Sequence, residues 1–193
     1  MSEELFKKLA EVQRKLAKRV VERPLDLSAI KTVGAVDVSY RGGRARAAFL
    51  ICSFPECEVL KQRVVEVDVS FPYIPTFFFL RETRPVLVAI GRERPDVLLV
   101  EGHGKAHPRG YGLASHIGLV LGIPTIGVAK RPLRDAPEGS WVKVDKTYVS
   151  VGHLVDLPSA VEIVKALSRG GYPLPLRIAD RLSKELTRGH QEE

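Results

Sequence analysis

The stretch PDVLLVEGHGKAHPRGYGLASHIGLVLGIPTIGVAK, residues 95–130, decides the fold, because it contains a strand, a glycine-rich turn, a helix and a second strand. Its first apolar run, Val97 to Val100, is short and lacks polar alternation, which is typical of a strand buried on both faces. Glu101 follows at the carboxyl end of that strand, where open α/β sheets gather their ligand sites. The stretch therefore predicts a functional site built on buried strands.

The rest of this stretch predicts a helix over residues 111–121 and a second buried strand over residues 124–128, which ends close to Lys130. The turn before the helix holds His103 and His107, four residues apart. Glycine and proline break this turn, so the two imidazoles do not share a helical face. With no further soft ligand nearby, we do not expect a zinc site.

An acidic residue also lies within the earlier strand TVGAVDVSY, residues 32–40, which is apolar up to Asp37. An unpaired buried carboxylate costs several kcal/mol or becomes protonated, so we expect a cation or a metal ion to face Asp37. The alternative is an edge strand that turns Asp37 to solvent. Residues 44–54 and 58–69 alternate apolar and polar side chains, which predicts two antiparallel strands that complete a meander with the first.

The segment FPYIPTFFFLRE, residues 71–82, links the meander to the next helix. Its two prolines exclude it from a sheet ladder, yet it carries the large apolar side chains of Tyr73 and Ile74. Two interpretations are open: a wedge that enters a binding partner, or a cover over an apolar seam. Glu82 is predicted to open a helix that runs to Ile90, where an acidic residue is favoured by the helix dipole.

The remaining segments predict three helices, a short peripheral hairpin and a frayed tail: helices over residues 3–22, 158–169 and 175–186, the hairpin over residues 141–151 and the tail over residues 187–193. The first helix should lie with one face on the core. Cys52 and Cys57 flank a predicted hairpin turn and have no Cys or His pair nearby. This leaves a buried thiol pair or a strained disulfide.

Composition limits the class of protein. The chain has 193 residues, 45% of them hydrophobic and 27% charged, which suits one sizeable core, so we expect a single domain over residues 1–193. Lys and Arg number 30 against 23 Asp and Glu, and the resulting net charge of +7 favours a polyanionic partner. We find neither an apolar stretch of membrane-spanning length nor a signal-peptide core, and we expect a cytoplasmic monomer.

The order of elements predicts an α/β fold of the ribonuclease H-like kind, with a mixed central sheet of an antiparallel meander plus parallel strands, flanked by helices. Its first and fourth strands would be neighbours, which brings Asp37 and Glu101 together with Glu82 at the mouth. Such carboxylates repel one another unless a hard divalent cation lies between them, and carboxylate oxygens suit Mg²⁺, with Mn²⁺ as a substitute. Such a cation can activate a water and stabilise the charge that gathers on a phosphodiester during hydrolysis. Lys130 would add a positive charge beside the same phosphate. The arrangement therefore predicts metal-dependent phosphodiester hydrolysis.

Four ordered motifs also carry a family resemblance: VDVSY around Asp37, PYIP followed by FLRE, EGHGKAHPRGYGLASHIG, and PTIGVAK. Together they are similar to endonuclease V, the deoxyinosine 3′ endonuclease family, over residues 5–186. The resemblance implies Mg²⁺-dependent hydrolysis of the second phosphodiester bond 3′ to a deaminated adenine in DNA, which leaves a nick for repair. Inosine-containing RNA is a further expected substrate.

The resemblance also implies a role for each matching residue of the site. The metal-binding acids are Asp37, Glu82 and Glu101, the fourth metal-site residue is Asp180, and the catalytic lysine is Lys130. The expected nucleic-acid contacts are the wedge Tyr73, Ile74 and Pro75, the pocket glycines Gly102, Gly104 and Gly110, and the AHPR turn with His107 and Arg109. Backbone groups at those glycines could read hypoxanthine, whose O6 acceptor and N1–H donor are the reverse of adenine's pattern.

Two positions depart from the family pattern. Glu101 replaces the usual Asp and is one methylene longer, so we expect the position of the metal ion or the rate of hydrolysis to differ. Thr76 replaces the usual Gly after PYIP, which bears on the stiffness of the wedge. Two rival functions share these features: another ribonuclease H-like nuclease without inosine specificity, and a catalytically silent nucleic-acid-binding module.

Overall fold

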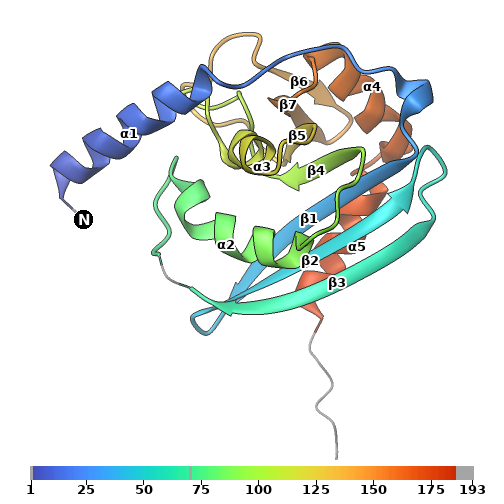
Figure 1. The fold of residues 1–193 in the computed structure, drawn as a ribbon, viewed down its shortest axis with the longest axis horizontal. Helices are drawn as coiled ribbons and strands as arrows, with labels where there is room; N and C mark the ends of the chain where they lie inside the picture. The colour runs from blue at the N-terminus through green and yellow to red at the C-terminus, as the bar shows by residue number, and fades with distance from the viewer. Residues whose placement is uncertain (1, 70, 186–193) are drawn as a thin grey trace, which may run out of the picture.

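The computed structural model describes residues 2–69 and 71–185, in which a seven-stranded sheet carries helices on both faces (Figure 1). The strands are β1 (Thr32–Arg41), β2 (Arg44–Ser53), β3 (Val59–Asp68), β4 (Val97–Glu101), β5 (Thr125–Ala129), β6 (Trp141–Val144) and β7 (Thr147–His153). The helices are α1 (Glu3–Ala17), α2 (Phe78–Ile90), α3 (Leu113–Leu121), α4 (Leu157–Ser168) and α5 (Leu174–Lys184), with a short 3-10 helix η1 (Leu27–Ala29).

The sheet has the strand order β3-β2-β1-β4-β5-β7-β6. Strands β1, β2 and β3 form the expected antiparallel meander, while β1, β4 and β5 run parallel. The apolar residues of β4 and the whole of β5 are buried, as continuous apolar runs predict. The ribonuclease H-like arrangement expected from the sequence is therefore confirmed, including the adjacency of β1 and β4.

Two apolar cores lie on opposite faces of this sheet. One packs the sheet against α4 and α5, and the other packs it against α2 and α3. Side chains of β1 alternate between them, so that Ala35 belongs to the core of α4 and α5 while Val36 belongs to the core of α2 and α3. Asp37 lies two residues beyond Ala35 and therefore faces the side of the sheet that α5 covers.

Helix α2 begins at Phe78, so the prediction that Glu82 opens this helix is wrong. Phe77 and Phe79 are buried in the core of α2 and α3, and this burial extends the helix towards its N-terminus. Glu82 consequently lies in the second turn of α2. Its position is explained by what it contacts and not by the helix dipole, which acts mainly within the first turn.

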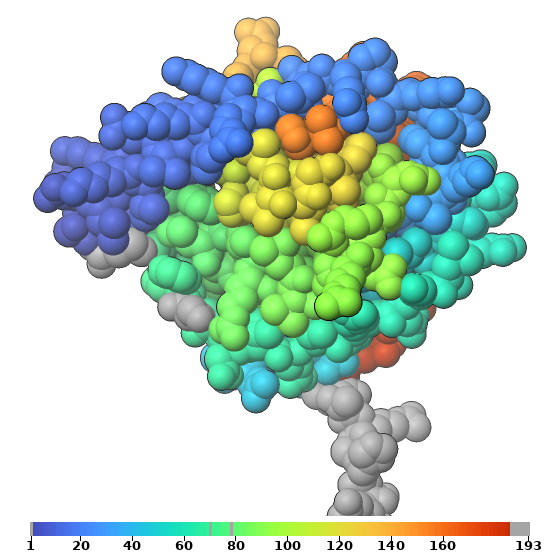
Figure 2. Space-filling view, in the orientation of Figure 1, coloured from blue at the N-terminus to red at the C-terminus, as the bar shows by residue number. Residues whose placement is uncertain are grey.

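Helix α1 is shorter and more exposed than its periodicity predicts. It ends at Ala17, and the apolar side chains of Leu5 and Val12 are 40% and 46% exposed. Phe6 packs instead on the core of α2 and α3. Figures 1 and 2 show α1, in dark blue, projecting from the edge of the molecule.

Two smaller expectations also change. The β6–β7 hairpin forms as predicted, but it is not a peripheral ribbon, because β7 pairs with β5 and so extends the central sheet. Cys52 and Cys57 are free and buried, with their sulfur atoms 3.1 Å apart, so the thiol pair is the correct alternative. The predicted tail, residues 187–193, lies outside the described residues, as does the last residue of the helix expected over 175–186.

No helix in the described part of the chain is long and apolar enough to cross a membrane.

Candidate functional site

Asp37 and Glu101 lie side by side at one end of the sheet. The parallel ladder of β1 and β4 pairs Val36 with Val100, and the next residue of each strand is a carboxylate. Because directly paired residues of neighbouring strands point to the same face, both acids face the side covered by α5. Two strands distant in sequence thus bring together the two acids that the sequence predicts.

Burial dominates the electrostatics of Asp37. Desolvation, followed by the nearby carboxylates of Glu101 and Asp180, raises the pKa of Asp37 to about 8. The Val38 N–H donates to Asp37 Oδ1 at 2.8 Å and partly offsets this increase. The alternative of an edge-strand carboxylate turned to solvent is excluded, because β1 is an interior strand and Asp37 is desolvated there.

Helix α5 delivers Asp180 to the same place. Burial acts to raise the pKa of Asp180, but the ammonium of Lys184, one turn later, donates to its Oδ1 at 2.6 Å and leaves the pKa below its ordinary value. Asp180 also shares a hydrogen bond with Asp37. Asp180 is therefore the ionised member of a carboxylate pair that retains one proton.

Glu82 approaches from the opposite face of the sheet, on α2. The Tyr40 hydroxyl donates to Glu82 Oε1 at 3.2 Å, and the guanidinium of Arg81 lies 3.9 Å from the Tyr40 ring centroid. Burial raises the pKa of Glu82 to about 7, although Tyr40 and Arg81 act against the shift. Glu82 also lies near enough to Glu101 for their charges to interact.

Tyr172 also lies in this site, although the sequence does not predict it. Its hydroxyl donates a hydrogen bond to Glu101 Oε2, and its ring lies 5.8 Å from the ammonium of Lys130. Burial raises the pKa of Glu101, and the Tyr172 hydrogen bond and the Lys130 charge oppose the increase. Burial and the adjacent carboxylates raise the pKa of the Tyr172 hydroxyl, so that it stays a donor.

The donor set has the chemistry of a site for a hard divalent cation, since it offers carboxylate oxygens whose mutual repulsion a cation would relieve. Within residues 2–69 and 71–185, however, no three His, Cys, Asp or Glu side chains converge into a ready-made ion site. Protein partners occupy several of the carboxylate oxygens instead: Lys184 at Asp180, Tyr40 at Glu82 and Tyr172 at Glu101.

A cavity of about 350 Å³ opens beside these acids. It is lined by Gln13, Thr76, Phe79, Glu82, Glu101, Gly102, His103, His107, Gly112, Leu113, Ala129, Lys130, Arg131, Pro132 and Leu133. The lining joins two of the predicted acids and the predicted lysine to the glycine-rich turn. A lining that combines charged groups with apolar side chains suits a planar base attached to a phosphate.

The pocket glycines separate into different structural roles. Gly102 lies in the cavity wall. Gly104 and Gly110 do not line this cavity. A Cβ on Gly104 would lie 1.9 Å from the Val151 carbonyl oxygen, so close packing on β7 explains that glycine. Gly110 has a φ of +68°, which favours glycine for conformational reasons.

His107 and Arg109 are turned towards Thr76. The Arg109 N–H donates to His107 Nδ1 at 3.1 Å, so His107 Nε2 carries the proton that it donates to the Thr76 carbonyl at 2.8 Å. The Arg109 guanidinium donates to the same carbonyl and to Thr76 Oγ1, both at 2.8 Å. Burial lowers the pKa of His107 to about 4, so its ring is neutral. The described contacts of both side chains are structural, although His107 also borders the cavity.

Gln13 completes this network from α1 and was missed in the sequence. Its side chain is fully buried, accepts from Arg109 Nε at 2.6 Å, and donates to the Tyr111 carbonyl at 3.1 Å and to the Thr76 carbonyl at 3.4 Å. A polar residue on the inner face of a charged helix was the only signal available. Gln13 thus ties the exposed helix α1 to the cavity wall by hydrogen bonds.

The proline segment exposes some of its side chains and packs one of them on the core. Tyr73 is 59% exposed, and Pro75 is exposed beside it. Ile74 packs against the core of α2 and α3 and therefore covers an apolar seam. The segment ends at Thr76, whose φ of +67° lies in the left-handed region where the family pattern has glycine. The network around Thr76 holds the end of the segment in this conformation.

Comparison with known proteins finds that the chain is similar to members of one protein family. The Endonuclease V family model matches residues 14–144 and 138–181. Endonuclease V of Thermococcus kodakarensis is 82% identical over 190 residues, which cover 98% of this chain and 94% of that protein. The solved catalytic domain of human Endonuclease V is 30% identical with a TM-score of 0.84, covering 95% of this chain and 96% of that one.

A second solved structure contains nucleic acid. Endonuclease V of Ciona intestinalis, in complex with a 23mer DNA containing an inosine followed by a ribo-adenosine, is 25% identical to this chain with a TM-score of 0.84. The match covers 95% of this chain and 97% of that one.

Proposed function

Because the chain belongs to the endonuclease V family and is therefore a nuclease, we propose that it recognises deoxyinosine in DNA and hydrolyses the second phosphodiester bond 3′ to that lesion with the help of Mg²⁺. The product would be a nick that begins repair. The observation that carries the proposal is the shared cavity, in which Glu82, Glu101 and Lys130 line the same space as the glycine-rich turn. A phosphate and an adjacent base could be held there together.

The acids are proposed to hold the cation. Asp37, Glu101 and Asp180 lie on the α5 side of the sheet, near enough for their charges to interact, and Glu82 borders the cavity, so their oxygens would supply hard ligands. When bound, Mg²⁺, or Mn²⁺ in its place, would lower the pKa of a water and stabilise the charge that gathers on the phosphate. Binding requires that the proton held between Asp37 and Asp180 leaves and that Lys184 releases Asp180.

Lys130 is proposed as the fixed positive charge of the site. It follows β5 and lines the cavity, with its ammonium 5.8 Å from the Tyr172 ring. At this place it would stabilise a phosphate oxygen as negative charge develops there. The aromatic ring beneath the ammonium limits the positions that Lys130 adopts.

The base pocket is proposed to distinguish hypoxanthine from adenine by fixed polar groups. Gly102 brings main-chain atoms to the wall, and the neutral rings of His103 and His107 border the same space. Hypoxanthine presents an O6 acceptor and an N1–H donor where adenine presents the opposite pair. Fixed groups would therefore leave a buried polar atom unpaired when adenine enters, which is the costly mismatch.

Tyr73 is proposed as the wedge that replaces the extruded base in the stack. It is the most exposed large apolar side chain in the described residues and extends from a segment whose end is fixed at Thr76. Extruding a base costs a few kcal/mol of stacking and pairing, and an inserted aromatic ring recovers part of this. Pro75 stiffens the segment next to Thr76.

Inosine-containing RNA is proposed as a second substrate. The nucleic acid bound to the Ciona relative carries a ribo-adenosine directly after the inosine, so that fold accepts a 2′-hydroxyl at this position. We further propose that residues 1–193 act as one endonuclease V-like domain and as a monomer.

Nick mapping tests the proposal. Duplexes of identical sequence with inosine or adenine at one position are incubated with Mg²⁺ or with a chelator, alongside a matched inosine-containing RNA. We expect one nick, at the second bond 3′ to inosine, only when Mg²⁺ is present. Equal cutting of the adenine duplex would instead favour a ribonuclease H-like nuclease without inosine specificity. Binding without any cutting would favour the catalytically silent module.

A further inference from the structure

A second concavity, of about 340 Å³, lies next to the acids and has no role in the function described so far. It is lined by Ser39, Tyr40, Arg41, Arg44, Arg46, Glu66, Ser183, Lys184 and Glu185. Four of these side chains are cationic and two are anionic. The concavity borders the candidate site at two points, because Tyr40 donates to Glu82 and Lys184 donates to Asp180.

The register of the hairpin shows why these cations lie together. The ladder of β1 and β2 pairs Asp37 with Ala48, Ser39 with Arg46, and Arg41 with Arg44. Paired residues point to the same face and the side-chain period of a strand is two. Arg41, Arg44 and Arg46 therefore share the face of the sheet on which Asp37 lies, and they continue from it along the hairpin.

Sheet stability does not explain the pair at the tip of this hairpin. Arg41 lies directly opposite Arg44, and like charges at such positions destabilise an antiparallel pair. On its other side Arg44 pairs with Asp68, and Arg46 pairs with Glu66, where opposite charges are favourable. Arg41 forms no ion pair with any of the described residues. An anion from outside the chain would relieve the repulsion between Arg41 and Arg44 at this exposed turn.

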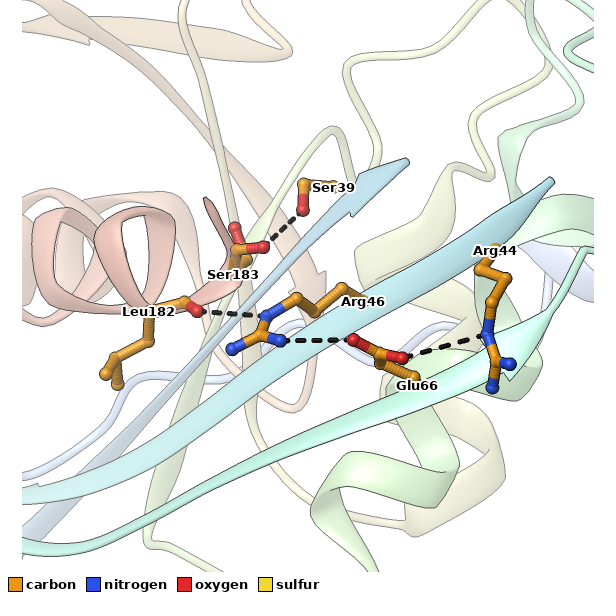
Figure 3. Close-up of polar contacts among 6 residues, drawn as sticks. All are labelled: Ser39, Arg44, Arg46, Glu66, Leu182 and Ser183. Atoms are coloured by element: carbon orange, nitrogen blue, oxygen red, sulfur yellow. Dashed lines mark hydrogen bonds and ion pairs between the residues drawn. The ribbon is translucent and has the colours of Figure 1, made fainter. Parts of the chain in front are cut away.

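The floor of the concavity is held in place by the end of α5 (Figure 3). Arg46 Nε donates to the Leu182 carbonyl at 3.3 Å while its guanidinium contacts Glu66 at 3.1 Å, and Ser39 Oγ donates to the Ser183 carbonyl at 2.5 Å. Figure 3 shows Glu66 between Arg46 and Arg44, which limits the directions in which these guanidinium groups point. The cations are thus partly preorganised, whereas those on a flexible surface patch would not be.

We propose that this concavity is a phosphate-binding subsite for the nucleic-acid strand that extends away from the cleaved bond. The inference rests on the proposed function, because it takes the end of β1 that carries Asp37 as the place of cleavage. Arg41 lies four residues beyond Asp37, about 13 Å at the rise of a β-strand. A nucleic-acid strand advances about 3.4 Å per nucleotide along its axis, so the phosphate held here lies about four nucleotides from the cut. Guanidinium groups suit phosphate because they donate paired hydrogen bonds.

Binding measured as a function of salt tests the subsite. The variants are Arg41→Gln and Arg44→Gln, and Arg92→Gln is the matched control, since it removes the same charge from an exposed position in the turn that follows α2. Affinity for a long inosine duplex is measured in chelator over a series of salt concentrations. Each subsite variant should lower the slope of log affinity against log salt by about 0.9, the contribution of one phosphate contact, and the control should leave it unchanged.

Truncated duplexes locate the contact. When the duplex ends within about two nucleotides of the cleaved bond on the subsite side, both variants should bind like the wild-type protein; when it is shortened on the other side, the deficit should persist. Unchanged slopes for both variants, a deficit equal to that of Arg92→Gln, or a deficit insensitive to truncation on either side would each overturn the subsite.

Adding Mg²⁺ to the wild-type protein on the same long duplex tests the proposed function separately. If the wild-type protein nicks the duplex but the salt slopes of both variants are unchanged, the subsite is rejected and the proposed function is retained. If the variants have reduced salt slopes but the wild-type protein does not nick, the phosphate contact is retained and the proposed function is rejected.

Discussion

The Tyr172 hydroxyl donates a hydrogen bond to the Glu101 carboxylate, from a loop more than seventy positions away in the sequence. Glu101 stands where the family pattern has the shorter Asp, and the longer side chain has an additional rotatable bond. The hydrogen bond removes part of that freedom by holding Oε2. Tyr172 therefore acts as a positioning residue for the one acid of the site that departs from the family pattern.

Replacing Tyr172 by Phe should weaken Mg²⁺ binding by about 10- to 100-fold, the usual cost of losing a partner that orients a metal ligand. The ring and its contact with Lys130 are retained, so the loss is that of the hydroxyl alone. The Mg²⁺ concentration needed to raise the melting temperature measures the effect without reference to activity. Tyr148→Phe, on β7, is the matched control; an equal Mg²⁺ dependence in both variants would refute the positioning role.

The acid cluster should make the metal-free protein less stable as pH rises. Because the pKa of Asp37 is raised to about 8 and that of Glu82 to about 7, the folded state holds protons that the unfolded chain releases near pH 4. The free energy of unfolding must then fall between about pH 4 and pH 8. Urea denaturation in chelator should show this decline, and Asp37→Asn should make it shallower. A decline of unchanged slope in Asp37→Asn would contradict the assignment.

Gln13 should stabilise the cavity wall despite its place on an exposed helix. In Gln13→Leu the Tyr111 carbonyl and Arg109 Nε lose a partner, whereas the Thr76 carbonyl keeps the bonds from His107 and Arg109, and an unsatisfied buried group costs about 1–3 kcal/mol. We expect a loss of that size in urea denaturation, together with weaker binding of inosine DNA. The exposed neighbour Glu11 provides the control Glu11→Leu, which should change stability by less than about 0.5 kcal/mol.

Tyr73→Ala should weaken binding to inosine DNA without affecting the fold. Losing one aromatic–base stack costs about 1–3 kcal/mol, which corresponds to roughly a 5- to 150-fold change in affinity. Tyr73→Phe keeps the ring and should bind like the wild-type protein. Fluorescence anisotropy in chelator measures both variants; equal affinity of Tyr73→Ala and wild type would exclude the wedge.

The arrangement of the sheet could be predicted because it depends on local patterns. Short apolar runs ending in Glu101 and near Lys130 identify buried parallel strands, and the element order then requires β1 beside β4. The same reasoning brings Asp37 to Glu101, because strand register follows from burial.

Contacts made by tertiary packing could not be predicted in the same way. Tyr172 and Gln13 carry no periodic signal, and their roles arise only when a loop and a helix end dock on the sheet. Helix α2 begins four residues before Glu82, the start that the sequence predicts, because the burial of Phe77 and Phe79 extends the helix beyond what local propensity suggests. The resemblance implies a nucleic-acid contact for Arg109, and the structure shows its guanidinium bound to Thr76 and Gln13, a tertiary contact without a local signal.

The most direct test of the central claim is single-turnover cleavage of inosine DNA by Asp37→Asn, with binding of the same DNA measured in chelator. The substitution preserves shape and removes one carboxylate charge from the proposed cation site. We expect binding within about threefold of wild type and cleavage slowed by about 10²–10³-fold or more, the scale of losing one preorganised electrostatic group. Cleavage by Asp37→Asn at nearly the wild-type rate would contradict the account.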